Sequence, residues 1–557
     1  MMKTKRMLSL AMAGVLSIGT LTTAGCGKEK IEGNNALEIY LCKLGNGRDW
    51  LDNALAAFAE KQYVKDKYPN FQYDVSADSE YAKGQAEVLS GTTTFDLLFA
   101  STFSPQTVET QGKDGKPSIL EEITDVYNGK IPDFNGGYEK NADGEEWTFA
   151  EKMRKEDPNR FNSLGFKDDE GETHYYYTTA GSNLYGILYN KTKLIEYGYL
   201  TEDADGNVQG LPRTTDELKA FAEKIKNGGH TPFVAAKDTG YWTRVQNLWW
   251  AQYEGAEAYD RYFQGMYEND EGEWKRDVEV LSKTQGRLLA NQVTESLLWY
   301  DNGLIHKDSA IFNFTQAQTK LLLGEGLMQA NGTWFDTEMK EIAAEAGNNT
   351  EIRLMTTPML SDIIKVVPDK SIDDDKELSS VVAALESGAT SLEGVTQKDF
   401  DRVKEAYSIY NLGEAFSPVL IPSYSDATEL AKDFVRFLAT DEFARIFMQA
   451  TGGSSSSFYY DVETADPALY NSFSAMQKDR IKIMKGKSSI LQYKTCNYPI
   501  VYRTSYSDFG KGYELYYMLA AKNDRKHAAD LIAAQIEDYT RNDNQKWNML
   551  LTQAGLK

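Results

Sequence analysis

The chain of 557 residues carries 83 acidic residues against 60 Lys and Arg, which gives a net charge of −23. This excess of negative charge disfavours nucleic acid and anionic lipid as partners, so a neutral ligand fits better. The length exceeds what one hydrophobic core organises, which predicts more than one lobe.

Residues 1–25 have the composition of a secretory signal. Lys3, Lys5 and Arg6 precede an apolar run that is too short to cross a membrane. The run is followed by Thr-Thr-Ala-Gly-Cys, and this ending at Cys26 resembles a bacterial lipobox. The resemblance implies cleavage before Cys26 and a lipid, diacylglycerol with palmitate, on its thiol. A free cysteine behind an ordinary signal is the alternative.

The mature chain would therefore be attached to the cell membrane and face the extracellular side or the periplasm. Residues 26–36 are polar and contain glycine, which suits a flexible tether. No later run approaches the roughly 20 apolar residues that span a bilayer. Cys42 and Cys496 are the other cysteines, and the sequence leaves open whether they pair.

Residues 37–100 alternate between strand and helix patterns. Apolar or alternating segments at 37–42, 71–75 and 95–100 predict strands, and helical spacing predicts helices at 50–58 and 81–90. This βαβαβ order predicts a parallel sheet whose strand ends bring three loops to one edge. The candidate ligand-binding residues in these loops are Arg48, Asp49, Ser79, Glu80, Ser101 and Thr102. Ordinary connecting loops and helix caps would account equally well for such residues.

A second α/β pattern begins with a Thr214-x-x-Glu217 capping box, which starts a predicted helix. A predicted strand at 231–236 follows. Tyr241 and Trp242 come shortly after this strand, and both are candidate ligand-binding residues. We expect Trp242 to face a crevice, because α/β sheets bind ligands beyond the carboxyl ends of their strands.

The stretch Leu321–Phe335 reads as the end of an apolar helix, a Gly-containing turn and a short apolar strand. Asn331 and Gly332 then place Trp334 at the end of this strand. Trp334 is therefore placed to offer a flat ring to a ligand in the crevice. The alternative is a core aromatic residue beside a turn.

The order of several motifs resembles one protein family. These motifs are Phe95-Asp96-Leu97-Leu98, Gly186-Ile187-Leu188-Tyr189-Asn190 before a Pro-x-Thr-x-x-Glu-Leu-like helix start, Gly324-Glu325-Gly326-Leu327-Met328 with Asn331-Gly332-Thr333-Trp334, the helix 426–438, and Thr451-Gly452-Gly453. Together they resemble the extracellular solute-binding proteins of ABC importers, in the branch that contains maltose-binding protein. The resemblance covers the mature chain, with insertions at about 125–180, 360–410 and 455–490.

This resemblance implies a two-lobed α/β fold with discontinuous lobes and a hinge. The first lobe would comprise 37–180 plus 357–452, and the second 181–356 plus 453–557. The chain would cross between lobes near Ala180-Gly181, Met355-Thr356 and Gly452-Gly453, where short extended segments could act as hinges.

The same resemblance implies that Trp334 is a platform for a sugar, with Trp242 and Tyr498 as further contacts. Sugars present apolar C–H faces and a rim of hydroxyls, so aromatic stacking combined with polar side chains suits them. The expected partners are a carbohydrate ligand and the permease subunits of an ABC transporter, with the protein itself a monomer.

Catalysis has little support in the sequence. The four histidines are well separated, and no HExxH, Gly-x-Ser-x-Gly or P-loop motif occurs, so we expect no enzyme, no cofactor and no metal. A surface glycoside hydrolase remains an alternative, because 83 acidic residues could include a suitable carboxylate pair. An oligopeptide-binding receptor is a second alternative. We expect a lipid-anchored protein that captures a carbohydrate, an oligosaccharide in our interpretation, and delivers it to the permease.

Overall fold

The structure is a computed structural model. It describes residues 35–43, 45–91, 94–100, 103, 105–108, 116, 118–168, 172–204, 206–237, 240–264, 266–269, 271, 274–276, 285–345, 350–412, 416–490, 526–533, 543–553 and 555. These residues all belong to one compact unit, Gly33–Lys557. The predicted signal and Cys26 lie outside the described residues, as do Cys496 and Tyr498. No described helix is long and apolar enough to span a membrane.

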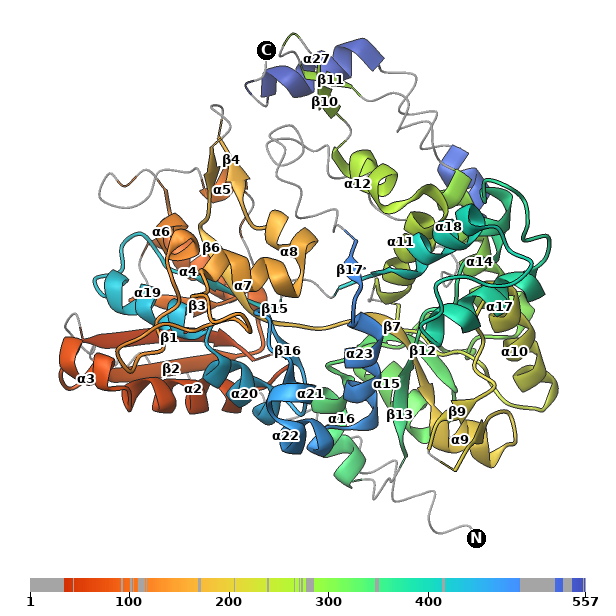
Figure 1. Ribbon diagram of the computed structural model, residues 1–557, viewed down its shortest axis with the longest axis horizontal. Helices are drawn as coiled ribbons and strands as arrows, with labels where there is room; N and C mark the ends of the chain where they lie inside the picture. Colours follow the sequence, from red (N-terminus) through yellow and green to blue (C-terminus); the bar gives the residue numbers. More distant parts are fainter. Residues whose placement is uncertain are drawn as a thin grey trace. The chain divides into compact units, whose positions relative to one another are not determined.

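Six strands form the larger sheet, in the order β16-β6-β15-β3-β1-β2 (Figure 1). They are β1 (Ala36–Cys42), β2 (Gln72–Asp78), β3 (Leu97–Phe99), β6 (Tyr177–Ser182), β15 (Phe416–Leu420) and β16 (Ser455–Ser456). β1 pairs in parallel with both β2 and β3, and the helices α2 (Asp49–Ala59) and α4 (Tyr81–Ser90) lie between these strands in the chain. The predicted parallel βαβαβ unit is confirmed. Cys42 is buried and pairs with Asp78, so the loops after β1 and β2 leave the sheet at the same edge.

Aromatic packing holds helices against this sheet. Trp50 of α2 is fully buried, and its ring lies 5.3 Å from Phe447 and 6.1 Å from Phe443 of α20 (Asp441–Ala450). The other helices and the small hairpin that belong to this part are α3 (Gln62–Lys67), α5 (Pro105–Val108), α6 (Thr124–Asn128), α7 (Phe149–Glu156), α8 (Pro158–Asn162), α19 (Thr428–Phe437), β4 (Phe166–Lys167) and β5 (Thr173–His174). Burial of the Trp50, Phe443 and Phe447 rings stabilises the packing of α2 against α20.

A second sheet has the order β12-β7-β13, and both outer strands are antiparallel to the central one. Its strands are β7 (Tyr185–Asn190), β12 (Met328–Gly332) and β13 (Ile352–Met355). The predicted strand 231–236 lies beside β12 as an extended segment, in which Phe233 bridges in parallel to Met328. The predicted helix start is confirmed, because the Thr214 side chain accepts a hydrogen bond from Glu217 N at the beginning of α10 (Thr215–Asn227).

Helices and short hairpins surround this second sheet. They are α9 (Lys191–Glu196), α10, α11 (Tyr241–Glu254), α12 (Ala256–Gln264), α14 (Gln285–Leu298), η2 (Tyr300–Asn302), α15 (Phe314–Leu323), α16 (Phe335–Glu345), β8 (Thr201–Glu202), β9 (Val208–Gln209), β10 (Met266–Glu268) and β11 (Trp274–Arg276). Farther along the chain come η3 (Ser361–Lys365), α17 (Asp375–Glu386), α18 (Gln397–Tyr407), β14 (Ile409–Tyr410), α21 (Val462–Ala465), α22 (Pro467–Ser472), α23 (Ala475–Met484), β17 (Ser488–Ser489) and α27 (Asp543–Gln553).

Residues 357–412 pack beside the second sheet. Thr214 at the start of α10 forms a parallel bridge with Met359. Arg402 of α18 donates from Nη2 to the carbonyl oxygens of Gln252 and Tyr253, both at 2.7 Å. The elements that follow β13 therefore attach to α10 and α11, the helices of the second sheet.

The predicted crossing near Met355-Thr356 is therefore wrong, and so is the assignment of 357–412 to the first lobe. β13 does end at Met355, but the chain enters the six-stranded sheet only at β15, after Leu412. The reason is an insertion: η3, α17 and α18 form their own apolar cluster on the second lobe before the chain returns. A sequence pattern that ends a strand does not show which lobe receives the next helix.

The other two crossings lie close to their predicted places. β6 ends at Ser182 in the larger sheet and β7 begins at Tyr185 in the smaller one, so the first crossing is three residues from the predicted Ala180-Gly181. After Gly452-Gly453, β16 still pairs with β6, and the chain reaches the second sheet with α23, which packs on β13. The third crossing is thus longer than predicted.

Candidate functional site

Three aromatic rings meet where the first crossing enters the second sheet. Tyr185 is the first residue of β7, Tyr241 the first residue of α11, and Trp334 follows β12. The Trp334 ring lies 5.1 Å from Tyr185, perpendicular to it, and 5.6 Å from Tyr241. Tyr185 and Tyr241 lie 5.8 Å apart. We call these three residues the aromatic cluster. Both tyrosines are partly exposed, whereas Trp334 is 6% exposed.

Gly332 allows the Trp334 ring to fold back onto its own strand. A Cβ atom at position 332 would lie 2.0 Å from Cζ3 of Trp334, so the ring occupies the space that any other residue would need. Gly332 itself pairs with Tyr185 across the β12–β7 ladder. The sequence Asn-Gly-Thr-Trp thus fixes the ring against Tyr185 through a close approach that only glycine permits.

Four polar residues form a hydrogen-bonded group, and two of them, Asn183 and Thr333, lie close in the chain to Tyr185 and Trp334. The group comprises Asn46, Asn183, Thr333 and Ser454, which we call the crossing polar cluster. Ser454 Oγ lies 3.3 Å from Oδ1 of both Asn46 and Asn183, and Thr333 Oγ1 donates to Asn183 Oδ1 at 3.1 Å. All four are buried. The Nδ2 groups of Asn46 and Asn183 are buried donors without a hydrogen-bond partner in the described part of the chain.

Charged groups flank the aromatic cluster. The guanidinium of Arg244, one helical turn after Tyr241, lies 5.4 Å from the centre of the Tyr185 ring. Asp336 and Glu338 lie in the first turn of α16, directly after Trp334. Burial raises the pKa of Asp336 to about 6, against the hydrogen bond from Ser474, and burial also raises the pKa of Glu338. The aromatic cluster therefore has a cation over the Tyr185 ring, and the two carboxyl groups that follow Trp334 in the chain are poorly solvated.

Trp242 does not face a crevice in this structure. Its side chain is 1% exposed and packs edge-on against Phe233, with ring centres 5.5 Å apart. Tyr241 and Trp242 were expected at the end of a strand, shortly before a helix, but they form the first turn of α11. Successive helical residues point about 100° apart. Tyr241 therefore reaches the aromatic cluster while Trp242 enters the core.

The predicted first-lobe residues that the structure describes lie at one edge of the larger sheet. Arg48, Asp49, Ser79 and Glu80 are all exposed. Arg48 Nε donates to Asp52 Oδ2 at 2.8 Å and its Nη1 donates to Val75 O at 3.2 Å. The parallel pairing of β1 and β2 brings these loops together, as predicted. Their contact with a ligand stays a prediction, and Ser101 and Thr102 lie outside the described residues.

Tyr185, Asn46 and Asn183 were not among the residues predicted from the sequence. Asn183 lies between β6 and β7, Tyr185 is the first residue of β7, and Asn46 lies in the predicted loop after β1. The sequence does contain a signal for Tyr185. This residue begins an apolar strand, Tyr-Gly-Ile-Leu, and so lies at a strand end. Its meeting with Trp334 depends on the pairing of β7 with β12, which are far apart in sequence.

No group of three or more His, Cys, Asp or Glu side chains among the described residues is arranged to hold a metal ion. His174, for example, lies between Glu122 Oε1 at 2.9 Å and Asp168 Oδ2 at 3.1 Å, on opposite sides of its ring. His230 stacks on Tyr197 with ring centres 3.8 Å apart. These two histidines join neighbouring segments within their own lobes.

No protein-family model and no curated protein sequence matches the chain. Solved structures do match. One from Caldanaerobius polysaccharolyticus, described in work on xylan utilization, is 12% identical with a TM-score of 0.53, over 91% of this chain and 100% of that one. A probable secreted solute-binding lipoprotein from Streptomyces coelicolor is 12% identical with a TM-score of 0.52, over 92% and 99%. Maltose-bound MalE3 of T. maritima is 13% identical with a TM-score of 0.51, over 90% and 98%. The chain therefore has the two-lobed α/β fold of the solute-binding proteins, as the sequence resemblance implied.

Proposed function

We propose that this protein is a lipid-anchored, extracellular substrate-binding protein that captures a carbohydrate between its two lobes and delivers it to an ABC transporter permease. The observation that carries the proposal is the aromatic cluster at the first crossing. Three rings from three separate elements converge there, beside buried amide groups at the crossings. Rings bind the C–H faces of a sugar, and amides bind its hydroxyls.

The fold supports a carbohydrate as the ligand. MalE3 of T. maritima is named as bound to maltose, and a further match with a TM-score of 0.50 is named as a chitin oligosaccharide binding protein. An oligosaccharide is the ligand we favour, because the cluster offers more than one ring. The strongly negative chain also favours a neutral sugar over an anionic ligand.

The lipid anchor rests on Cys26 behind its apolar run. Replacing this residue by Ala should leave the protein unprocessed or released, whereas the wild type should partition into detergent. Mass spectrometry of the mature N-terminus measures the modification directly. An unmodified N-terminal residue in the wild type would contradict the anchor without touching sugar binding.

Capture between lobes requires that the crossings act as hinges. In the described structure, Ser454 joins Asn46 of the first lobe to Asn183 of the first crossing. Opening would separate this contact and expose the amides, and a ligand would then replace it. Small-angle scattering should show a smaller radius of gyration with saturating sugar. An unchanged profile at demonstrated saturation counts against hinge closure, unless the free protein is already closed.

Calorimetry with a panel of oligosaccharides tests the ligand, and two tryptophans of the same lobe supply the variant and its control. Trp334→Phe should weaken sugar binding at least tenfold, about 1.4 kcal/mol, because the smaller ring covers less of the sugar face. Trp242→Phe should lower the free energy of unfolding, because Trp242 is a core residue. Its affinity for sugar should remain that of the wild type. Equal affinities in the two variants would remove Trp334 from the site.

The enzyme alternative makes a different prediction. A glycoside hydrolase would release reducing ends from the sugar it binds, whereas a binding protein returns the ligand intact. Incubation of the purified protein with each bound oligosaccharide, followed by a reducing-end assay, separates the two. Thermal-shift screening against oligopeptides tests the peptide-receptor alternative in the same way.

A further inference from the structure

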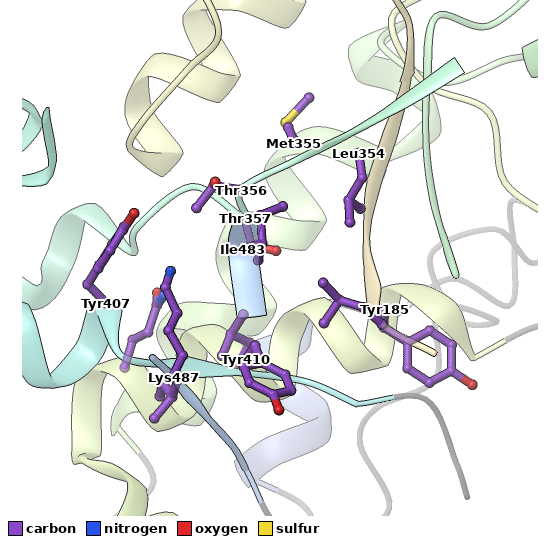
Figure 2. A pocket seen from close by; sticks show the side chains of 13 residues that line it. Tyr185, Leu354, Met355, Thr356, Thr357, Tyr407, Tyr410, Ile483 and Lys487 are labelled. Carbon is purple, nitrogen blue, oxygen red and sulfur yellow. The ribbon is translucent and has the colours of Figure 1, made fainter. Parts of the chain in front are cut away.

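A small cavity lies inside the second lobe, beside the place where the chain leaves for the larger sheet (Figure 2). The end of β13 and the residues after it form one wall, with Thr356 and Thr357. The end of α18 and the start of β14 form another, with Tyr407 and Tyr410. Lys487, between α23 and β17, closes it. Tyr185 of the aromatic cluster also lines this cavity, but in Figure 2 its ring points away from the other lining side chains.

Lys487 places a cation at this cavity without a carboxylate partner in the part of the chain that the structure describes. Its Nζ lies 3.5 Å from the centre of the Tyr407 ring, and this is its one side-chain contact with a polar or aromatic group there. An ammonium has three N–H donors, and a ring face satisfies at most one of them. Burial lowers the pKa of Lys487 to about 8, which is the effect of an uncompensated charge.

The acidic group whose charge acts on Lys487 has another partner, and so does the carboxylate beside Tyr410. Glu386, whose charge acts on Lys487, accepts a hydrogen bond from Arg213 Nε at 2.8 Å. Asp157 accepts from the Tyr410 hydroxyl at 3.1 Å and from Ser489 Oγ at 2.9 Å. The charge of Glu386 therefore offsets only part of the effect of burial on Lys487. A buried charge without a partner is costly, so an occupant of opposite charge would be stabilised here.

Further donors line the same cavity. The hydroxyls of Thr356, Thr357 and Tyr407 make no hydrogen bond within the described residues, and in Figure 2 the Lys487 amine lies on the side of Tyr407 and the two threonines. Gln252 also lines the cavity, with its Oε1 accepting a hydrogen bond from Leu360 N, and Leu248, Leu354 and Ile483 supply apolar wall. Hydroxyl and ammonium donors in a largely apolar wall suit an anion better than a cation.

The size of the cavity limits the occupant. It offers about 20 Å³ to the centre of a water-sized sphere, enough for one or two water molecules or a single small ion. A sugar or a phosphate would not fit. We propose that this cavity binds one halide-sized monovalent anion, held by the Lys487 ammonium and the hydroxyls of Thr356 and Thr357. Such an ion would connect the end of β13, the end of α18 and the segment before β17, close to where the chain leaves the second lobe.

A bound anion must stabilise the folded protein by mass action, so thermal unfolding reports it. The full mature protein is melted in increasing sodium chloride, with sodium gluconate at equal ionic strength as the reference. Chloride should raise the melting temperature of the wild type above the gluconate value by a few degrees, and sodium acetate should not. Lys487→Met should abolish the chloride-specific increment.

Lys485→Met is the matched control. Lys485 lies two residues away, is exposed, and pairs with Glu463 at 2.8 Å, so its loss changes surface charge but not the cavity. This variant should keep the full chloride increment. Thr357→Val removes one hydroxyl and should reduce the increment even if Lys487→Met does not fold. Equal increments in the wild type and Lys487→Met would overturn the proposal.

Diffraction gives the direct answer on the wild type. Crystals grown in sodium bromide should show an anomalous peak within hydrogen-bond distance of Lys487 Nζ. Ordered water alone at this position, or a carboxylate of the chain itself paired with Lys487, would overturn the proposal. Neither result bears on sugar binding, which is tested separately.

Discussion

The two sheets of this protein are built from the chain in different ways. The parallel strands β1, β2 and β3 of the larger sheet come from one continuous stretch, 36–99, whereas the smaller sheet joins β7, β12 and β13 from segments that begin at 185, 328 and 352. In the larger sheet the big aromatic residue Trp50 is fully buried among phenylalanines. At the smaller sheet, the rings of Tyr185, Tyr241 and Trp334 meet at the first crossing, and the two tyrosines remain partly exposed.

The difference shows where a binding site can form. The continuous βαβαβ unit buries its largest ring, Trp50, against Phe443 and Phe447 of α20, so this ring contributes to stability. A sheet assembled from distant segments brings side chains of separate elements together at one end, as Tyr185, Tyr241 and Trp334 demonstrate. We therefore expect that damage to the first lobe mainly lowers stability, whereas damage near the second sheet also lowers affinity.

The largest effect should come from Asp433 in the first lobe. This carboxylate of α19 is 2% exposed in its side chain and accepts from Tyr63 OH at 3.0 Å, Tyr68 OH at 2.8 Å, Lys67 Nζ at 2.7 Å and Arg436 Nη1 at 2.8 Å. Asp433→Asn removes the charge that these four donors share. The free energy of unfolding should fall by about 3–5 kcal/mol, measured by denaturant titration.

Glu60→Gln is the control for Asp433→Asn. Glu60 is exposed and pairs with Lys65 at 2.7 Å, so its replacement should leave the unfolding midpoint unchanged. Sugar affinity, measured well below the melting temperature, should be that of the wild type in both variants. A loss of affinity in folded Asp433→Asn would break the division of roles between the two lobes.

A smaller effect should follow from the ion pair between β13 and α23. Arg353 donates to both oxygens of Asp479, at 2.8 and 2.5 Å, and both side chains are mostly buried. Arg353→Met leaves Asp479 without its cation and should lower the free energy of unfolding by about 2–3 kcal/mol. Because α23 follows the third crossing, sugar affinity should fall as well. Unaltered affinity would show that α23 has no part in closure.

Gly332→Ala tests the aromatic cluster without removing a ring. The new Cβ would lie 2.0 Å from Trp334 Cζ3 and 2.1 Å from Cη2, so the ring must move. Overpacking of this kind should cost about 1–3 kcal/mol of stability. Sugar affinity should fall about tenfold, 1.4 kcal/mol, and the tryptophan emission should shift.

Gly240→Ala is the matched control for Gly332→Ala. Gly240 precedes Tyr241, has a negative φ of −81°, and a Cβ there would meet no atom within 4 Å. This variant should keep both stability and affinity. If Gly332→Ala also bound sugar normally, the position of the Trp334 ring would not matter for the ligand.

Much of the fold could be predicted because its signals are local. The strand and helix patterns of 37–100 predict both the elements and their parallel pairing, since a short crossover leaves few other arrangements. The location of 357–412 could not be predicted in this way. It depends on contacts such as Thr214 with Met359, between segments about 145 residues apart in the chain, and no local pattern records them.

The candidate site shows the same limit at single residues. The sequence places Trp334 at a strand end correctly, because Asn-Gly after an apolar strand is a local signal. It places Trp242 wrongly, because the first residue of α11 could not be fixed, and one step along a helix decides whether a ring faces the cluster or the core. Tyr185 was missed because its partners come from other elements.

The smallest effects concern two histidines with opposite pKa shifts, one in each lobe. Hydrogen bonding to Glu122 and then to Asp168 raises the pKa of His174 above its ordinary value of 6.5. Its stabilising contribution is therefore fully present below about pH 6.5 and is lost as the pH rises through the folded-state pKa. His174→Gln should remove this decline between pH 6 and 8. The change should stay below about 1 kcal/mol, since a third of the side chain is exposed.

His306 in the second lobe should give the opposite slope. Burial lowers its pKa, and its Nδ1 accepts a hydrogen bond from Asp308 N at 3.2 Å, which requires the neutral ring. The unfolded chain binds the proton more tightly, so stability rises with pH through the ordinary value of 6.5 and is lost as the pH falls. His306→Gln should remove this rise. Urea titrations of the wild type and both variants across pH 5–8 measure how the free energy of unfolding changes with pH. Contributions of the same sign from the two histidines would contradict the assignment of hydrogen bonding to His174 and burial to His306.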